Sequence, residues 1–260
     1  MEIFEKRSII KFSGSTFENK EDFVVNETPL TVMLNRQELA TIVCSPYAQK
    51  ELVVGFLAGE GLIKKYSDIT DYFHREKQEV VWVETLDSSI GMENFMGRNF
   101  GSCCGKSRPT LYFRNDSEQI KPLTGNARFS ATELQDLIRQ LDEGSDTFRM
   151  TGGVHSAALA DNSQILVKYE DIGRHNALDR VLGHTIIKGI ATEDKAVLLS
   201  GRISSEMLIK AARIGTPLVV SRSAPTGLAI DLAEQLNITA VGFARGNSMN
   251  VYSHAERIVQ

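Results

Sequence analysis

The first half of the chain alternates between apolar and polar positions in short runs. Residues 30–34 and 39–44 form two such runs, and Asn35 and Arg36 lie between them. This pattern predicts a β-hairpin with a short turn. Residues 79–86 alternate in the same way and predict a half-buried strand.

One helix is predicted between these strands. Apolar residues at positions 52, 53, 56 and 57 have helical spacing, and the pattern stops at Gly59 and Gly61. Ser45 and Pro46 predict where it begins, as an N-cap residue followed by proline at the first helical position. Past the strand at 79–86 the chain is glycine-rich without clear periodicity, and a further strand is predicted over 110–114.

The second half of the chain changes to longer apolar runs separated by amphipathic segments. Ser130 and Glu133 form a capping-box pattern ahead of an amphipathic helix. The apolar runs that follow it cover 165–170, 196–200, 217–221 and 238–243. Helices are expected between them, beginning near Asn176, Ser204 and Pro225. Strands alternating with helices predict right-handed crossovers and a mostly parallel sheet, which is an α/β fold.

A polar connector near residues 120–130 predicts a domain boundary. We expect a smaller, strand-rich α+β domain over 1–125 and an α/β cofactor-binding domain over 126–260. The first domain should carry a long loop, at about 87–108, that contains two cysteines. A loop of this length in a compact domain is typically functional or disordered.

Composition and charge narrow the possible functions. The 260 residues are 42% hydrophobic, and 33 acidic side chains against 29 basic ones give a net charge of −4. Neither half of the chain is basic, which argues against nucleic acid as a partner. No apolar stretch reaches the length of a membrane span, and the amino terminus lacks the apolar core of a secretion signal. A cytoplasmic protein without a membrane partner is therefore expected.

The three cysteines are too few for a disulfide framework, and they divide into two kinds. Cys44 lies in an apolar run and is expected to be buried. Cys103 and Cys104 lie between glycine and serine residues, and residues 94–115 contain four cations and no acidic side chain. Nearby cations favour the thiolate over the thiol, so this pair is a candidate carrier of sulfur or redox chemistry. The alternative is that both are incidental exposed cysteines.

An arginine follows each of the four predicted strands of the second half. Ligands of open α/β sheets bind at the carboxyl ends of the strands, where glycine and serine let backbone N–H groups approach an anion. These four arginines therefore predict a site for a phosphate-bearing ligand; they are Arg174, Arg202, Arg222 and Arg245. The alternative is ordinary ion pairing with Asp171, Asp179 or Glu206.

Two histidines fall near the same strand ends. His175 lies at a predicted helix start close to Asp171, where an imidazole could bind a ligand or transfer a proton. His155 follows two glycines and could face the same site. A structural role is an equal alternative for both residues.

Two further motifs are excluded around the cysteine pair. A P-loop needs a glycine five residues before Gly105, where Phe100 stands, and Pro109 argues against a following helix. Two adjacent cysteines supply at most half of a tetrahedral zinc site, and the zinc-deaminase signature is absent. We therefore expect no metal ligands in the protein itself.

Several motifs, in order along the chain, resemble those of the formate dehydrogenase accessory sulfurtransferases, the FdhD family. The resemblance extends from about Asn26 to Ile258. The matching segments are Gly-Phe-Leu-Ala-Gly-Glu-Gly at 55–61, Thr-Gly-Gly-Val-His at 151–155, Glu-Asp-Ile-Gly-Arg-His-Asn at 170–176, Ser-Gly-Arg-Ile-Ser-Ser-Glu at 200–206, Ser-Arg-Ser-Ala-Pro-Thr at 221–226 and Gly-Phe-Ala-Arg-Gly at 242–246.

The resemblance implies a cytoplasmic homodimer with a cytidine-deaminase-like carboxyl-terminal domain that lacks the deaminase zinc site. It implies that sulfur is taken from a cysteine desulfurase as a persulfide and passed to the molybdenum bis(molybdopterin guanine dinucleotide) cofactor, which then serves formate dehydrogenase. A guanine nucleotide such as GDP is expected to occupy the same site. The resemblance places Phe243, Ala244, Arg245, Gly246, Asn247 and Ser248 in the cofactor pocket. The strand ends add Arg202, Ser221, Arg222, Ser223, Arg174 and His175.

One departure from the family pattern concerns the cysteines. Many members carry Cys-x-x-Cys before Gly-Lys, whereas Cys103 and Cys104 are adjacent here. An ungapped alignment matches Cys104 to the second cysteine, and a two-residue deletion matches Cys103 to the first. We expect Cys103 to carry the persulfide and Cys104 to assist. Their Cα atoms, about 3.8 Å apart, are too close for an ordinary disulfide.

Two other functions stay open at this point. A molybdenum-cofactor chaperone would bind and insert the cofactor without covalent sulfur transfer, so its cysteines would be dispensable. A nucleotide-processing enzyme would use His175 and Asp171 as acid and base, and would lose turnover on His175→Ala.

Overall fold

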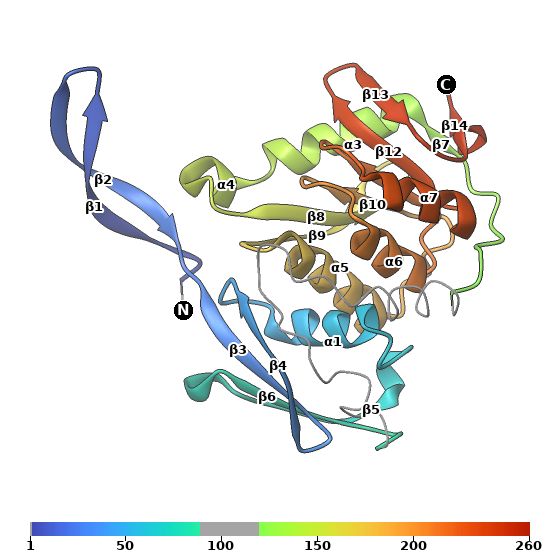
Figure 1. The fold of residues 1–260 in the computed structure, drawn as a ribbon, viewed down its shortest axis with the longest axis horizontal. Helices are drawn as coiled ribbons and strands as arrows, with labels where there is room; N and C mark the ends of the chain where they lie inside the picture. Colours follow the sequence, from blue (N-terminus) through green and yellow to red (C-terminus); the bar gives the residue numbers. More distant parts are fainter. Residues whose placement is uncertain (1, 89–119) are drawn as a thin grey trace.

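A computed structural model describes residues 2–88 and 120–260 of the chain. Its strands form a four-stranded sheet, a six-stranded sheet and two small two-stranded sheets (Figure 1). The predicted cysteine loop beyond residue 88 and the strand predicted over 110–114 lie outside the described residues.

The six-stranded sheet organises the second half of the chain. Its strand order is β13-β12-β11-β10-β8-β9. The strands are β8 (His155–Ala160), β9 (Ile165–Asp171), β10 (Ala196–Leu199), β11 (Leu218–Ser221), β12 (Thr239–Arg245) and β13 (Ser248–Val251). β10, β11 and β12 are parallel, whereas β8 and β13 are antiparallel to their neighbours. The prediction of a mostly parallel sheet is therefore only partly right, because β8 reverses direction between β10 and β9.

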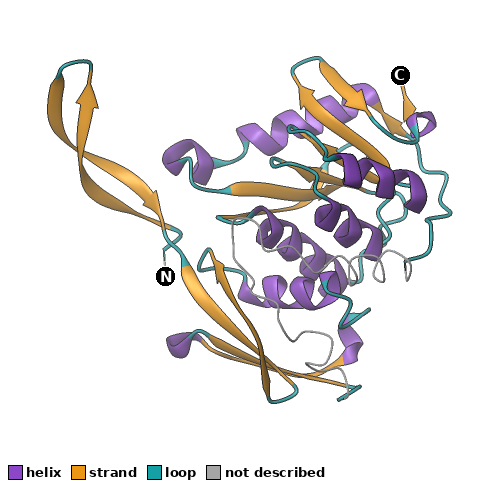
Figure 2. Cartoon of the chain, in the orientation of Figure 1, coloured by secondary structure: helices purple, strands orange, loops and turns teal. Residues whose placement is uncertain are grey.

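Helices cover both faces of this sheet (Figure 2). They are α3 (Ala131–Glu143), α5 (Arg174–Lys188), α6 (Ser205–Arg213) and α7 (Gly227–Leu236), with the short α4 (Asp146–Thr151) after α3. Successive strand residues point to opposite faces, so Val197 and Leu199 pack with α5, α6 and α7, while Leu198 packs with α3. Ser130, Ser204 and Thr226 cap α3, α6 and α7 with their side chains. The predicted N-cap at Ser130 is confirmed, because its hydroxyl accepts a hydrogen bond from the Glu133 N–H at 3.4 Å.

The four-stranded sheet belongs to the first half of the chain. Its order is β4-β3-β6-β5, with β3 (Thr28–Leu34), β4 (Gln37–Cys44), β5 (Ile69–Arg75) and β6 (Val80–Thr85). The predicted hairpin at Asn35 and Arg36 is confirmed, and both residues have positive φ. The helix α1 (Gln49–Gly59) packs on this sheet through its apolar residues.

The start of α1 differs from the prediction. Its N-cap is Ala48, not Ser45. The Ser45 N–H donates to Asp171 Oδ2 at 3.1 Å, and its hydroxyl accepts from the Ile172 N–H at 3.3 Å. Ser45 therefore forms hydrogen bonds with residues far along the chain and does not cap α1.

The helices α1 and α5, one from each half of the chain, cross each other at very close range. A Cβ atom built on Gly55 would lie 1.6 Å from the Asp179 carbonyl oxygen. One built on Gly183 would lie 1.8 Å from the Glu51 carbonyl oxygen. Only glycine at both positions lets the two backbones come so close. The motif at 55–61 therefore has a packing role in this crossing.

A two-stranded arm projects from the body of the molecule (Figure 1). It consists of β1 (Phe4–Ser13) and β2 (Thr16–Val25), which pair antiparallel along their full length. The small remaining sheet pairs β7 (Phe129–Ser130) with β14 (Ile258–Val259). No helix among the described residues is long and apolar enough to cross a membrane.

Candidate functional site at the strand ends

The carboxyl ends of four strands and the starts of the other two meet at one edge of the large sheet. β10, β11 and β12 are parallel, and β9 points the same way because two antiparallel ladders separate it from β10. β8 begins at this edge, where His155 is paired with Asp171. The predicted strand ends are therefore neighbours, and they point toward the side from which the arm projects (Figure 1).

Three loops at this edge are connected by hydrogen bonds. The Ser221 hydroxyl donates to the Gly201 carbonyl at 2.6 Å and accepts from the Ser223 N–H at 2.9 Å. The Phe243 N–H donates to the Ser223 carbonyl at 3.1 Å. The loops after β10, β11 and β12 therefore form one continuous backbone surface.

The last residues of β12 have an unusual backbone. Phe243 has φ +51° and a side chain that is 42% exposed, and the register shifts between Gly242 and Arg245. Positive φ is uncommon and costly for an aromatic residue and marks a turn or a strained position. Gly246 and Asn247 form the turn to β13, and the Ser248 hydroxyl donates to the Arg245 carbonyl at 3.3 Å. The Ala244 side chain is buried and packs in the core below.

The four arginines of this edge differ in their contacts. Arg222 forms an ion pair with Asp142 of α3. Arg245 donates from Nε to the Arg222 carbonyl at 2.7 Å, and its guanidinium lies 6.0 Å from the Phe243 ring centroid. Arg202 is exposed, and within residues 2–88 and 120–260 it has neither a hydrogen bond nor an ion pair.

A second group surrounds the start of α5. A Cβ atom on Gly201 would lie 3.4 Å from both His155 Nδ1 and Arg174 Cβ, so these residues are immediate neighbours. The Arg174 Nε atom is buried and has no hydrogen-bond partner among the described residues. Burial, and then the positive charges of Arg174 and His175, lower the pKa of His155. His155 is therefore a neutral imidazole near neutral pH.

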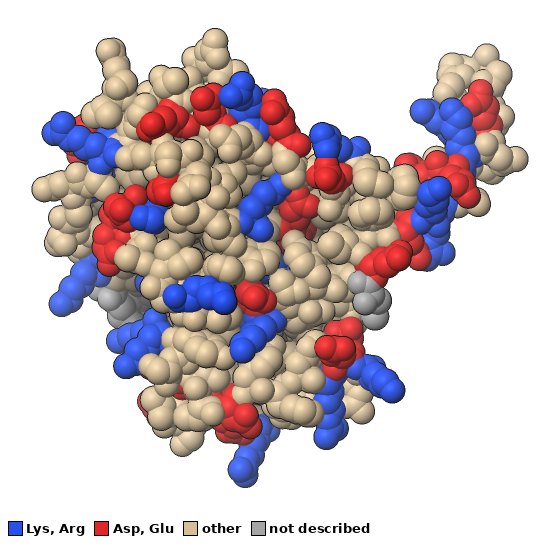
Figure 3. Space-filling view, turned by 180° about the vertical axis from the view of Figure 1, so that it is seen from behind, with Lys and Arg blue, Asp and Glu red and all other residues tan. Residues whose placement is uncertain are grey.

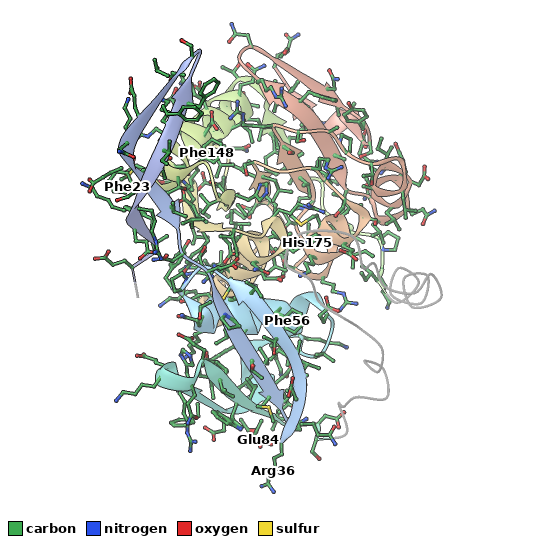
Figure 4. All side chains as sticks on the ribbon, turned by 60° about the vertical axis from the view of Figure 1, so that its left-hand side comes forward. Phe23, Arg36, Phe56, Glu84, Phe148 and His175 are labelled. Carbon is green, nitrogen blue, oxygen red and sulfur yellow. The ribbon has the colours of Figure 1, made fainter. Side chains whose placement is uncertain are left out.

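His175 pairs with an acidic residue of α6. Its Nε2 atom lies 3.2 Å from Glu206 Oε2. Figure 4 shows His175 in the half of the molecule that holds the large sheet.

Asp171 has a structural role. It is 0% exposed and binds Arg180 at 2.6 Å, and it also accepts hydrogen bonds from the Gly173 N–H and the Asn176 amide, both at 2.9 Å. A carboxylate with all these donors has no lone pair free for a substrate. The hypothesis that Asp171 and His175 act together as acid and base is therefore wrong for Asp171.

Two of the acidic residues considered as alternative partners of the edge arginines bind other residues. Asp171 pairs with Arg180, and Asp179 with Lys210 at 2.5 Å, both inside the protein. Asp142, the partner of Arg222, was not identified from the sequence. It lies eighty positions from Arg222, so no local pattern relates them. His155 could have been placed at the edge by recognising 155–160 as a strand.

The structure confirms the prediction for Cys44. Its side chain is buried, and burial raises the pKa of its thiol to about 12, so it is not a nucleophile near neutral pH. Cys103 and Cys104 lie outside the described residues. Within the described ranges, no three histidine, cysteine or acidic side chains come together as metal ligands.

Comparisons with known proteins agree with this architecture. A model of the FdhD/NarQ family matches residues 25–259. A relative from Bacillus subtilis (strain 168), named sulfur carrier protein FdhD, is 44% identical over 97% of this chain and 96% of its own. A relative of the same name from Listeria monocytogenes (strain EGD-e) is 44% identical over 99% of this chain and 100% of its own.

A solved structure from Desulfotalea psychrophila, assigned as a formate dehydrogenase accessory protein, has the same fold. It is 28% identical, covers 99% of this chain and 100% of its own, and superposes with a TM-score of 0.82. The family model covers both sheets and the strand-end edge as well as the two glycines of the helix crossing. The chain therefore belongs to the FdhD/NarQ family.

Proposed function

We propose that the protein is a cytoplasmic sulfurtransferase that serves the maturation of formate dehydrogenase. Relatives that match it over nearly their whole length are named sulfur carrier proteins, and the similar solved structure is assigned as a formate dehydrogenase accessory protein. These names support sulfur transfer as the activity. The route of the sulfur, from a cysteine desulfurase to the molybdenum cofactor, is the one that the resemblance to the family implies.

The sulfur is received on the cysteine pair. A thiolate of Cys103 or Cys104 attacks the outer sulfur of a persulfide on a cysteine desulfurase. A new S–S bond forms on this protein, the donor S–S bond breaks, and the donor leaves as a thiolate. The four cations in residues 94–115 favour the attacking thiolate. Cys44 takes no part, because its thiol is buried and its pKa is about 12.

The strand-end edge is the proposed binding site for the acceptor, molybdenum bis(molybdopterin guanine dinucleotide), which is bound as a substrate. The observation that carries this assignment is the junction of three connected loops with arginines on one edge. Arg202 and Arg245 offer guanidinium donors to the diphosphates. The backbone of 243–248 and the exposed Phe243 ring offer hydrogen bonds and a stacking surface to a guanine base. GDP should bind there as the smallest probe.

Intact-mass analysis tests the covalent step. Wild-type protein is incubated with an active cysteine desulfurase and cysteine, alongside Cys103→Ala, Cys104→Ala and, as a matched control, Cys44→Ala. We expect a reductant-labile gain of one sulfur atom that Cys44→Ala retains and one of the other variants loses. If the wild type gains no sulfur but still binds the cofactor, the protein is a chaperone that inserts the cofactor without carrying sulfur.

A further inference from the structure

The strand-end edge changes in chemistry from one side of the large sheet to the other. At β12 it carries the exposed Phe243 ring and the Arg245 guanidinium. At β8 it carries His155, which lies beside Arg174 and Gly201. The strand order β12-β11-β10-β8 separates these two ends by three steps, or about 14 Å at the usual strand spacing. The two ends therefore contact different parts of a ligand that spans the edge.

The middle of the edge is built from small residues and an exposed arginine. Ser221 and Ser223 lie at the end of β11, and Gly201 and Arg202 lie after β10. The Ser221 hydroxyl donates to the Gly201 carbonyl at 2.6 Å, so the two loops are in contact. A guanidinium such as that of Arg202 forms paired hydrogen bonds with phosphate oxygens. This middle part therefore suits a diphosphate.

The β8 end holds buried nitrogen atoms without hydrogen-bond partners. Arg174 Nε and His175 Nε2 are buried, and neither has such a partner within residues 2–88 and 120–260. His175 Nε2 lies 3.2 Å from Glu206 Oε2, which is an ion-pair distance without the alignment of a hydrogen bond. Buried polar atoms without partners are costly, and most of those in proteins are paired. Two of them in adjacent residues favour a polar ligand at this end of the edge.

His155 adds an uncharged group to the β8 end. Alternate residues of a strand share a face, so its side chain lies on the face of Ala157 and Leu159, toward α5 and α6. Burial, and then the positive charges of Arg174 and His175, lower the pKa of His155, so its imidazole is neutral near neutral pH. A neutral imidazole offers one donor and one acceptor. It therefore fits an uncharged heterocycle better than it fits a phosphate.

The overall charge of the protein does not orient a ligand. The net charge is −4, and acidic and basic side chains are interspersed over the face shown in Figure 3. Among the described residues drawn there, no broad basic patch attracts a polyanion. The order of individual groups along the edge therefore decides which way round the ligand lies.

We propose that the substrate lies across the edge with its guanine at β12, its diphosphate over β11 and β10, and its pterin against His155 at β8. This inference rests on the function proposed above and adds the direction of the substrate to it. The groups along the edge are an aromatic ring, small residues with an arginine, and a neutral imidazole. They follow the order of base, diphosphate and pterin in a pterin guanine dinucleotide. His155 and Arg174 then bind the end that receives the sulfur.

Titratable groups distinguish this direction from its reverse. Guanine and pterin offer similar hydrogen bonds, so base recognition alone does not separate the two directions. The β8 end holds two imidazoles, His155 and His175, and the Glu206 carboxylate. The β12 end offers Phe243 and Arg245, and an arginine stays protonated. Groups that change protonation near neutral pH gather where chemistry occurs, so the reacting end of the substrate belongs at β8.

Two small probes test the direction. GDP represents the nucleotide end and is followed by calorimetry, and 6-hydroxymethylpterin represents the other end and is followed by its fluorescence. Wild-type protein should bind both probes at once. His155→Leu should weaken pterin binding by about tenfold or more and change GDP binding by less than about twofold, because it leaves polar atoms of the pterin unpaired. Phe243→Ala should have the opposite pair of effects.

His184→Leu is the matched control. His184 is also half-buried with a pKa lowered by burial, but it lies in a later turn of α5 and contacts the Tyr169 hydroxyl at 3.1 Å. This variant should bind both probes as the wild type does. Pterin binding that is lost in Phe243→Ala and kept in His155→Leu would overturn the proposed direction, as would a wild type that binds GDP but no pterin. A wild type that binds no GDP would refute the binding site itself.

Discussion

The protein uses arginine in two opposite ways. At the junction of its halves, Arg180 is 0% exposed and binds Asp171 at 2.6 Å and the Ser45 carbonyl at 2.8 Å. At the strand-end edge, Arg202 is exposed and has no ion pair within the described residues. Arg180 uses its donors within the fold, whereas those of Arg202 are exposed, as the proposed binding site requires. The difference lies in burial, since the side chain is the same.

The motif at 170–176 contributes to both regions. Asp171 and Asn176 turn into the junction, where Asn176 also donates to the Val43 carbonyl at 2.9 Å. Arg174 and His175 turn toward the edge, beside Gly201 and Glu206. A single motif therefore connects the stability of the junction to the geometry of the site. Four sets of substitutions, in the junction and at the edge, test how far the two roles separate.

The largest effect is expected at the buried arginine. Arg180→Leu leaves the Asp171 carboxylate buried without its ion-pair partner, which should lower the free energy of unfolding by about 3–5 kcal/mol. Urea denaturation measures this loss. Arg202→Leu is the matched control and should change stability by less than about 0.5 kcal/mol. Equal losses in the two variants would contradict the division between structural and ligand-binding arginines.

The helix crossing should be nearly as sensitive. Gly55→Ala or Gly183→Ala forces the α1 and α5 backbones apart, because the new methyl group would lie within 2 Å of a carbonyl oxygen. We expect a loss of about 1–3 kcal/mol in denaturant unfolding. Gly227→Ala in α7 is the control, since a Cβ there meets nothing within 4 Å. If it destabilised the protein as much, close packing would not explain the glycines.

The edge arginines should act on ligand binding and leave stability unchanged. Arg202→Ala should weaken GDP binding by about tenfold or more, because a charged hydrogen bond to a phosphate contributes about 1.5–3 kcal/mol. Isothermal titration calorimetry measures the dissociation constant. Arg139→Ala removes an exposed arginine that pairs with Asp136 on α3 and should leave binding unchanged. Unaltered GDP binding by Arg202→Ala would remove Arg202 from the proposed site.

The smallest effect should be a pH dependence at the edge. The pKa of His155 is lowered by burial and by Arg174 and His175, whereas an unfolded histidine has a pKa of about 6.5. Below that pH the unfolded chain takes up the proton more readily, so the free energy of unfolding falls as the pH decreases. His155→Gln should flatten this slope between pH 7.5 and 5.5 in denaturant titrations. An unchanged slope would show that His155 does not contribute.

Periodicity made much of the fold predictable. The hairpin at Asn35, the strand at 80–85 and the α3 helix were all recognisable because their apolar residues repeat with the period of the element. The alternation of strands and helices after residue 165 also predicted that four arginines would share one edge. Position relative to a strand end is a local property, so a single sequence can reveal it.

Other features depended on contacts that no local pattern encodes. β8 was missed because its run at 155–160 is short and follows two glycines, and its insertion made the sheet mixed. Ser45 looked like a helix cap, but its N–H is bound by Asp171, which is 126 positions away. The arm was not predicted, since its strands carry many charges and leave one face exposed.

The sequence by itself determined the helices and strands that have clear periodicity, the buried state of Cys44, the arginines at the strand ends and the resemblance to a family that the comparisons confirm. The tertiary structure decided which of these charges are structural and which face solvent. Asp171 and Arg174 are three residues apart in one motif, yet the first is enclosed by β4, the β4–α1 connection and α5, and the second borders the open edge. Burial depends on what the rest of the chain places around a residue, and that is a property of the folded molecule.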